Sequence, residues 1–264
     1  FLKTMMMVLK PTCEGNDSLD PAMGIPQKLA DDFRSRAFNR AMNGIATIGM
    51  ATAALEDLQA VKKTTEYQPT IDRYRKVIQE YIKYWFSIGH LCTKVNGRPM
   101  FFYPYSPEAT PREKDGCKIF GRSEDIGHYS HCLQGVAVLY QTMPGVGIDD
   151  DFMTAVANAI HYNATTKVKI KGKTMLSGYV ECPTTSMVQP NTGGHLKDAG
   201  PAKERHYLLQ AFRDDMIDGL CSSLNKEKQA QVNSDYDHRA ATLYAQYLKV
   251  LRKDRTLIHL AEKK

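Results

Sequence analysis

The chain has 264 residues, of which 42% are apolar, so it is long enough to bury a substantial core as one large or two small domains. Lys and Arg number 35 against 29 Asp and Glu, which gives a formal charge of +6. This modest, scattered excess lacks the dense basic run of a nucleic-acid binder and fits an acidic small molecule or a polyanion better. No apolar segment approaches the ~20 residues needed to span a bilayer, so no membrane partner is expected.

The cysteines and glycosylation sequons point to an oxidising compartment. Six cysteines are spread along the chain without the close pairs of a metal knuckle: Cys13, Cys92, Cys117, Cys132, Cys182 and Cys221. An even count at wide spacing favours disulfides, although the sequence does not choose their pairing. Asn16-Asp-Ser18 and Asn163-Ala-Thr165 match the acceptor pattern for N-glycosylation. We therefore expect a secreted, disulfide-bonded glycoprotein.

The first 28 residues are expected to be either an ordered arm or the frayed remainder of a missing region, and a helix is predicted from about 30 to 61. Small residues crowd this helix between Gly44 and Ala54, which lets another helix approach closely, as in the inner layer of a helical barrel. Asn39 and Asn43 lie one turn apart on it. Asparagine is mildly unfavourable inside a helix, so the pair indicates either a polar cavity or hydrogen bonding between helices.

An amphipathic helix with a structural role is predicted over 70–88. Beyond it, Asn96-Gly97 is a strong tight-turn signal, and the run from Met100 to Tyr105 alternates like a strand. Prolines before and within this run limit it to an edge strand or an extended loop. Its aromatic side chains are expected either to stack on sugar rings or to form a small core of their own.

The densest set of reactive side chains lies between Arg122 and His131, directly before an apolar helical pattern. A helix is predicted over 124–143, with Ser123 as its N-cap and two acids in its first turn. On that helix, two trios would each lie in line along the surface: Arg122, Asp125 and Tyr129, and Glu124, His128 and His131. The acids and the N-cap are also ordinary helix chemistry, but this interpretation does not account for the arginine, histidines and tyrosine as a set.

The remaining segments are predicted to be mostly helical. Lys167 to Val180 alternates like a small hairpin, and a long loop over 182–200 holds His195. A loop of that length is usually functional or disordered. Amphipathic helices are predicted over three further ranges: 149–162, 201–224 and 235–251.

Several chemistries lack their motifs. No P-loop or dinucleotide fingerprint is present, and no nucleophile elbow supports a Ser-His-Asp site, so no cofactor is expected. His128 and His131 could hold a metal with Glu124 or His195, but zinc helices more often space their histidines by four. Glycoside hydrolysis needs two opposed carboxylates, for which Glu124 with a distant Asp is weak evidence. Elimination from a uronic acid sugar fits these residues better.

Such an elimination removes the proton alpha to the sugar carboxylate and expels the neighbouring glycosidic oxygen, which requires three kinds of group. Arg122 with Asn39 or Asn43 suits the neutralisation of the carboxylate. A histidine suits the base that takes the proton. Tyr129 suits the acid, because the high ordinary pKa of a phenol keeps its proton in place until the transition state.

The run from Arg122 to Tyr129, with Arg and Tyr seven residues apart before an apolar helix, resembles the alginate lyase type of α/α-toroid polysaccharide lyases. In that family, an Arg and a Tyr so spaced lie in the active cleft with an Asn from an earlier helix rich in small residues. Asn39 is the closer match to that Asn. The resemblance implies that Asn39, Arg122 and Tyr129 are catalytic.

One position departs from the family pattern. The alginate enzymes of the family carry His directly after that Asn, whereas this chain has Arg40. The base would then be His90 or His128, or Tyr129 would act as both base and acid. Further substrate contacts are expected from a wider set of side chains: Asn43, Arg40, Tyr103, Tyr105, Glu124 and His131.

The resemblance covers about residues 30–145 and implies a mainly α fold, in which antiparallel helical hairpins form a toroid with small β-hairpin excursions. A toroid of about six hairpins would need about twelve helices, whereas about six or seven are predicted here. We therefore expect a single domain over 1–264 that is a partial toroid, or a toroid that lacks its N-terminal hairpins.

The sequence thus predicts a secreted lyase that cleaves a uronate-containing polysaccharide by β-elimination, without a metal or a cofactor. An acidic polysaccharide is the expected partner, and the uronate and the oligomeric state are left open. One alternative is a glycoside hydrolase of the same architecture, with Glu124 or Asp125 as its acid. The other is a non-catalytic glycan-binding domain.

Overall fold

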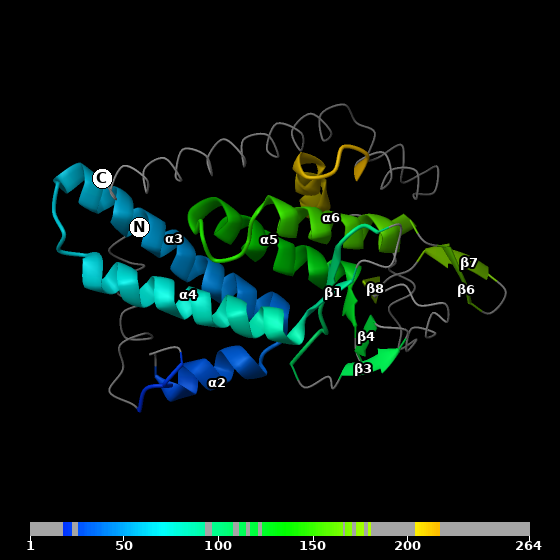
Figure 1. Cartoon of the computed structure of the whole chain (residues 1–264), viewed down its shortest axis with the longest axis horizontal. Helices are drawn as coiled ribbons and strands as arrows, with labels where there is room; N and C mark the ends of the chain where they lie inside the picture. The colour runs from blue at the N-terminus through cyan, green and yellow to red at the C-terminus, as the bar shows by residue number, and fades with distance from the viewer. Residues whose placement is uncertain are drawn as a thin grey trace.

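The computed structural model of this chain is mainly helical, as predicted, and its strands pair two by two. The residues that it describes are 18–22, 26–92, 97–107, 111–114, 117–120, 123–165, 167–170, 173–176, 179–180 and 204–216. The predicted helix over 235–251 lies outside them. Long helices build the body of the described part (Figure 1): α3 (Phe38–Lys62), α4 (Gln68–Ile88), α5 (Ile126–Thr142) and α6 (Asp150–Thr165).

Helices α3 and α4 form an antiparallel pair. The Arg75 guanidinium of α4 lies 2.7 Å from the Glu56 carboxylate of α3. Further along α3, Gln59 Nε2 donates to Gln68 Oε1, near the start of α4, at 3.1 Å. The contacts therefore advance along α3 as they recede along α4, which is the arrangement of a helical hairpin.

Helices α3 and α5 pack side by side in the same direction. Gly135 of α5 faces the Met42 backbone of α3, and a Cβ added there would lie 2.9 Å from Met42 O. Further along both helices, Gly49 of α3 faces Leu139, and a Cβ added to this glycine would lie 2.8 Å from Leu139 Cδ2. Because the contact advances along both helices together, they run parallel. The close approach expected from the small residues of α3 is confirmed.

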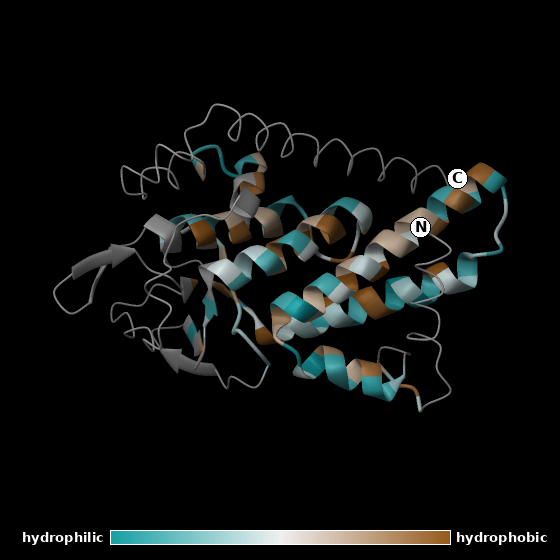
Figure 2. Ribbon diagram, turned by 180° about the vertical axis from the view of Figure 1, so that it is seen from behind, coloured by the Kyte–Doolittle hydropathy of each residue, from teal (hydrophilic) through white to brown (hydrophobic). Residues whose placement is uncertain are grey.

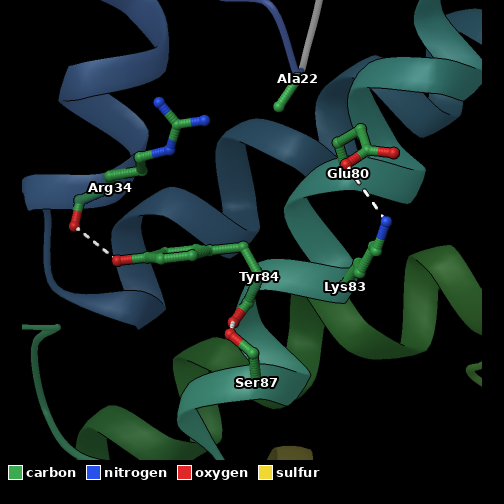
Figure 3. Close-up of a pocket in the computed structure, with 6 residues that line it drawn as sticks. All are labelled: Ala22, Arg34, Glu80, Lys83, Tyr84 and Ser87. Atoms are coloured by element: carbon green, nitrogen blue, oxygen red, sulfur yellow. Dashed lines mark hydrogen bonds and ion pairs between the residues drawn. The ribbon is translucent and has the colours of Figure 1, made fainter.

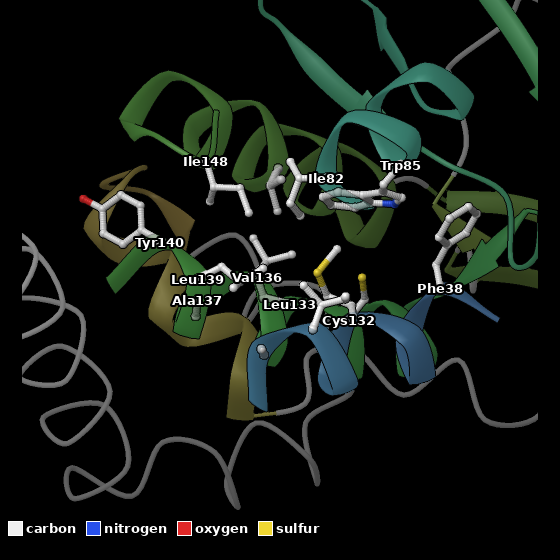
Figure 4. Packing of buried hydrophobic residues seen from close by; sticks show 14 of the residues in the cluster. Phe38, Ile82, Trp85, Cys132, Leu133, Val136, Ala137, Leu139, Tyr140 and Ile148 are labelled. Carbon is white, nitrogen blue, oxygen red and sulfur yellow. The ribbon is translucent and has the colours of Figure 1, made fainter. Parts of the chain in front are cut away.

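One continuous apolar core fills the space between these helices (Figure 4). Phe38 of α3, Trp85 of α4 and Leu133 of α5 are each at most 1% exposed. Along α2 and α4, Figure 2 shows both hydrophobic and hydrophilic residues, as expected of amphipathic helices. Helix α6 runs opposite to α5 (Figure 1), and near the turn between them the Tyr140 hydroxyl donates to Asp150 Oδ1 at 2.7 Å.

The helix predicted over 30–61 is divided in two. Helix α2 (Gln27–Ser35) ends before Arg36, and α3 begins at Phe38. Arg36 and Ala37 have ψ of 154° and 136°, which is extended backbone. Phe38 N donates to Tyr105 O at 3.1 Å. Neither Gly nor Pro marks this break, so a contact with a distant segment decides where α3 begins.

The strands gather beyond the end of the bundle at which α3 and α5 begin and α4 ends (Figure 1). Strands β1 (His90–Cys92) and β2 (Met100–Phe102) pair antiparallel, and Gly97 between them has a φ of +67°. Three further antiparallel pairs complete the set: β3 (Pro111–Lys114) with β4 (Cys117–Phe120), β5 (Glu124–Asp125) with β8 (Tyr179–Val180), and β6 (Lys167–Ile170) with β7 (Lys173–Leu176). The hairpin predicted to start at Lys167 is confirmed as β6 and β7.

The segment predicted as an α-helix over 201–224 differs in its described part. Residues Glu204–Ala211 form a 3₁₀ helix, η2, and the chain then turns toward Met216. Arg213 Nη1 donates to Asn158 Oδ1 of α6 at 2.6 Å, and Asn158 Nδ2 donates to Pro99 O at 2.9 Å. A 3₁₀ helix has weak internal hydrogen bonds, so these tertiary contacts stabilise it. Through Asn158, α6 holds both η2 and the approach to β2.

His161 of α6 should make the stability of this region depend on pH. Its side chain is 14% exposed and lies beside Arg213 and Asp215. Burial lowers the pKa of the imidazole below its ordinary 6.5 and Arg213 lowers it further, while Asp215 acts in the opposite direction. The unfolded chain therefore takes up a proton here at a higher pH than the folded chain, and stability should fall as the pH drops through about 6.5.

Denaturant unfolding at about pH 7.5 and about pH 5.5 measures this effect. His161→Gln should reduce the difference between the two midpoints. Equal differences in wild type and the His161 variant would contradict the assignment.

Candidate functional site

Three segments meet where α3 and α5 begin. The chain after β2 runs from Tyr103 to Tyr105 against both helices. Phe38 N, at the start of α3, donates to Tyr105 O at 3.1 Å. Pro104 forms an antiparallel bridge with Ser123, three residues before the start of α5. The aromatic run is therefore held between the N-termini of two parallel helices.

His128 and Tyr105 form the accessible part of this junction. Both side chains are half-buried, and their ring centroids lie 5.1 Å apart with an interplanar angle of 81°. His128 stands in the first turn of α5, and the backbone of Tyr105 is fixed by α3. An imidazole and a phenol thus lie side by side at this end of the bundle, and both are partly exposed to solvent.

The two asparagines in the first turns of α3 differ in exposure. Asn39 follows Phe38 directly and is 7% exposed, and its Oδ1 has no hydrogen-bond partner among the described residues. Asn43 is half-buried, and its Nδ2 donates to Asn39 O at 2.8 Å. An asparagine buried with an unsatisfied oxygen costs stability, so Asn39 is a candidate for a role beyond packing.

Tyr129 lies in the core. It is 1% exposed, stacks on Tyr103 with ring centroids 5.0 Å apart, and its hydroxyl donates to Phe101 O at 3.4 Å. Burial raises the pKa of the Tyr129 phenol well above its ordinary value, and nearby Cys132 and Glu124 add to this. The Tyr129 hydroxyl is therefore enclosed and does not face solvent. Tyr103, also 1% exposed, is enclosed as well.

The start of the α5 helix differs from the prediction. Glu124 pairs with Val180 across β5 and β8, and the helix begins only at Ile126. Ser123 is therefore not its N-cap, and Glu124 is not an acid of its first turn. The pairing with a strand more than fifty residues away decides this, which local pattern does not reveal. Glu124 is 0% exposed, so it lies beneath the junction and away from solvent.

The other expected site residues are dispersed. His90 is half-buried in β1, opposite Phe102 of β2. Arg40 on α3 and His131 on α5 are exposed. Arg122 and His195 lie outside the described residues, as does the side chain of Asp125.

The expected disulfide framework does not include every cysteine. Cys132 on α5 is a free thiol, 1% exposed, and lies close to the Tyr103 hydroxyl. Burial raises the pKa of this thiol far above its ordinary value, which keeps it protonated. The prediction of a disulfide is therefore wrong for Cys132.

A pocket of about 290 Å³ opens elsewhere, between α2 and α4 (Figure 3). It is lined by Ala22, Arg34, Glu80, Lys83, Tyr84 and Ser87. Its polar groups bond to one another: the Tyr84 hydroxyl donates to Arg34 O at 3.2 Å, and Ser87 Oγ donates to Tyr84 O at 2.7 Å. None of the expected site residues lines it, so it gives no support to them.

The sequence placed Tyr105 and His128 in one expected site but did not predict the direct contact of their rings, because the two residues lie twenty-three positions apart with no shared motif. It also missed the junction of Asn158 with Arg213, for which the charged run Arg213-Asp-Asp215 within an apolar segment was the available signal.

No family model matches the sequence, and neither the curated proteins nor the solved structures contain a significant match. In the part of the chain that the structure describes, no helix is long and apolar enough to cross a membrane. Within the same ranges, no three His, Cys, Asp or Glu side chains lie together as a metal ion would require.

Proposed function

We propose that this protein is a lyase that cleaves a uronate-containing polysaccharide by β-elimination. The observation that supports the proposal is the meeting of the α3 N-terminus with Tyr105 and His128 at an accessible place. Elimination needs groups that neutralise a carboxylate, take a proton and give a proton. An imidazole and a phenol meet there, and α3 carries the amides of Asn39 and Asn43 in its first turns. Each of these groups suits one of these tasks.

The uronate carboxylate would be neutralised mainly from α3. Asn39 and Asn43 supply amides, and exposed Arg40 supplies a cation from the same first turns. Arg122 would add a second cation from the segment that precedes α5. Charged and polar groups aimed at the carboxylate make the carbanion-like transition state tolerable, which is where catalysis must act.

The helix dipoles favour the same substrate class. The N-terminus of an α-helix carries a partial charge of about +0.5. Because α3 and α5 run parallel, both of these ends lie at the candidate site. An anionic sugar is therefore preferred there over a neutral one.

We further infer that the helices belong to a partial α/α toroid. In such a fold, successive inner helices run parallel, and each is followed by an outer helix that returns in the opposite direction. Helices α3 and α5 fit the inner positions, and α4 and α6 fit the outer ones. Two adjacent hairpins of this kind support the architecture that the sequence resemblance implies.

One form of the hydrolase alternative is less favoured. A hydrolase that used Glu124 as its acid would need this carboxyl group at the sugar, and Glu124 is 0% exposed. A glycan-binding domain without activity would use the same surface but would form no product.

A panel of polyuronates that includes alginate and glucuronan tests the proposal. Elimination leaves a double bond conjugated with the carboxylate, so at least one polymer should give a steady rise in ultraviolet absorbance. The same polymer with its carboxyl groups chemically reduced to alcohols is the matched control. It should give no rise in absorbance, because the carboxylate that makes the neighbouring C–H proton acidic has been removed. New reducing ends without absorbance would identify a hydrolase, and binding without cleavage would identify a binding domain. Either result would overturn the lyase proposal.

A further inference from the structure

The tyrosine that can meet a substrate is not the one that the sequence pattern favours. Tyr129 and Tyr103 are each 1% exposed and stack on each other within the core. Tyr105 is half-buried, two residues beyond Tyr103, and its ring stands edge-on to that of His128. Among these three tyrosines, only Tyr105 combines access from solvent with contact to a candidate base.

We propose that Tyr105 donates the proton to the leaving glycosidic oxygen and that His128 is the base that works with it. This inference rests on the proposed lyase function and assigns its acid to a residue outside the Arg122 to Tyr129 run. His128 Nε2 or Nδ1 takes the proton alpha to the carboxylate, and the C–H electron pair becomes the new carbon–carbon double bond. The bond from the neighbouring carbon to the glycosidic oxygen breaks, and that oxygen receives the Tyr105 proton.

One proton transfer between His128 and Tyr105 restores both groups after the reaction. After the elimination, His128 is an imidazolium and Tyr105 a phenolate, with ring centroids 5.1 Å apart. Transfer of the proton from the imidazolium to the phenolate restores both groups, so the net result is movement of one proton from carbon to the leaving oxygen. No oxidant, reductant or metal takes part.

The backbone on both sides of Tyr105 is fixed, as a proton donor requires. Its carbonyl accepts from Phe38 N at 3.1 Å, and the preceding Pro104 is bridged to Ser123. The phenol thus projects from a segment attached to both α3 and the approach to α5. Positioning of this kind lets a donor act without reorganisation in the transition state.

Tyr105→Phe tests the assignment, with Tyr129→Phe as the matched control. Both changes keep the ring and delete one hydroxyl. On the polyuronate that the wild-type protein cleaves, Tyr105→Phe should lower kcat about 10²–10⁴-fold with KM changed less than about threefold, because general acid catalysis acts in the transition state. Tyr129→Phe should keep more than about half of the wild-type kcat. Tyr105→His, which restores a proton donor on a ring, should recover part of the lost turnover.

The possible outcomes are distinguishable. If wild type cleaves a polyuronate and Tyr105→Phe, with unchanged thermal unfolding, keeps more than about a third of its kcat, the Tyr105 assignment fails while the lyase function stands. If Tyr129→Phe lost most of the wild-type kcat while Tyr105→Phe kept nearly all of it, Tyr129 would be the general acid and the Tyr105 assignment would be wrong. Absence of unsaturated product from wild type on every polymer would overturn the lyase function and this inference together. If Tyr105→Phe proved unfolded, an inactive but folded Tyr105→His would also overturn the inference.

Discussion

Replacing His128 with asparagine is expected to lower kcat for unsaturated product by about 10²–10⁴-fold, the usual contribution of a general base. The change removes the basic nitrogen but keeps a polar side chain in the first turn of α5. His128 is half-buried and the asparagine keeps a polar side chain at this position, so the thermal unfolding temperature should change little. Ultraviolet assays at saturating polymer and thermal unfolding of the same samples measure the two effects.

The neighbouring histidines provide the controls. His131→Asn alters an exposed side chain one turn further along α5 and should change kcat less than about twofold. His90→Asn alters a half-buried residue of β1, which is the other histidine expected as a base. If the large loss appeared in the His90 variant while the His128 variant remained active, the base would be His90 and the pairing with Tyr105 would have no catalytic meaning.

Replacing Trp85 with alanine is expected to cost about 3–5 kcal/mol of unfolding free energy, as for other fully buried large aromatic side chains. Its ring is 1% exposed and lies 5.0 Å from Phe101, 5.2 Å from Tyr103 and 5.7 Å from both Phe86 and Phe152. Since domains are stable by only about 5–15 kcal/mol, much of the variant should be unfolded at physiological temperature. Denaturant unfolding followed by circular dichroism measures the loss.

Two further changes calibrate this result. Trp85→Phe keeps most of the aromatic contacts and should cost clearly less than Trp85→Ala. Tyr84→Phe, at the adjacent half-buried position, deletes one hydroxyl that donates to Arg34 O and should cost about 1 kcal/mol. Equal losses from Trp85→Ala and Tyr84→Phe would contradict the large contribution expected of the buried Trp85 ring.

Helical periodicity predicted the body of the molecule well. The ranges expected over 70–88 and 149–162 correspond to α4 and α6, whose stripes face a single continuous core. The small residues of α3 correctly indicated close approach by another helix, since a Cβ added to Gly49 would lie 2.8 Å from Leu139 Cδ2 of α5. These features depend on residues three or four positions apart, so they can be predicted from the local sequence.

The errors occurred where distant segments decide local structure. The break between α2 and α3 depends on Tyr105, and the late start of α5 depends on the pairing of Glu124 with Val180. Burial of Tyr129 has the same origin, because its stacking partner Tyr103 comes from the segment after β2. The spacing of Arg122 and Tyr129 contains no information on depth below the surface, so it did not reveal that Tyr129 is buried while Tyr105 is partly exposed.

Trp85 is also an intrinsic fluorescence probe of this region. It is the only tryptophan in the chain, so its emission is uncontaminated by a second indole. Its ring touches Phe101 and Tyr103, and the chain continues from Tyr103 to Tyr105. A polymer that shifts this strand on binding should therefore alter the quantum yield or wavelength of the indole without any attached dye. Stopped-flow fluorescence could then time the encounter with substrate separately from the appearance of the absorbing product.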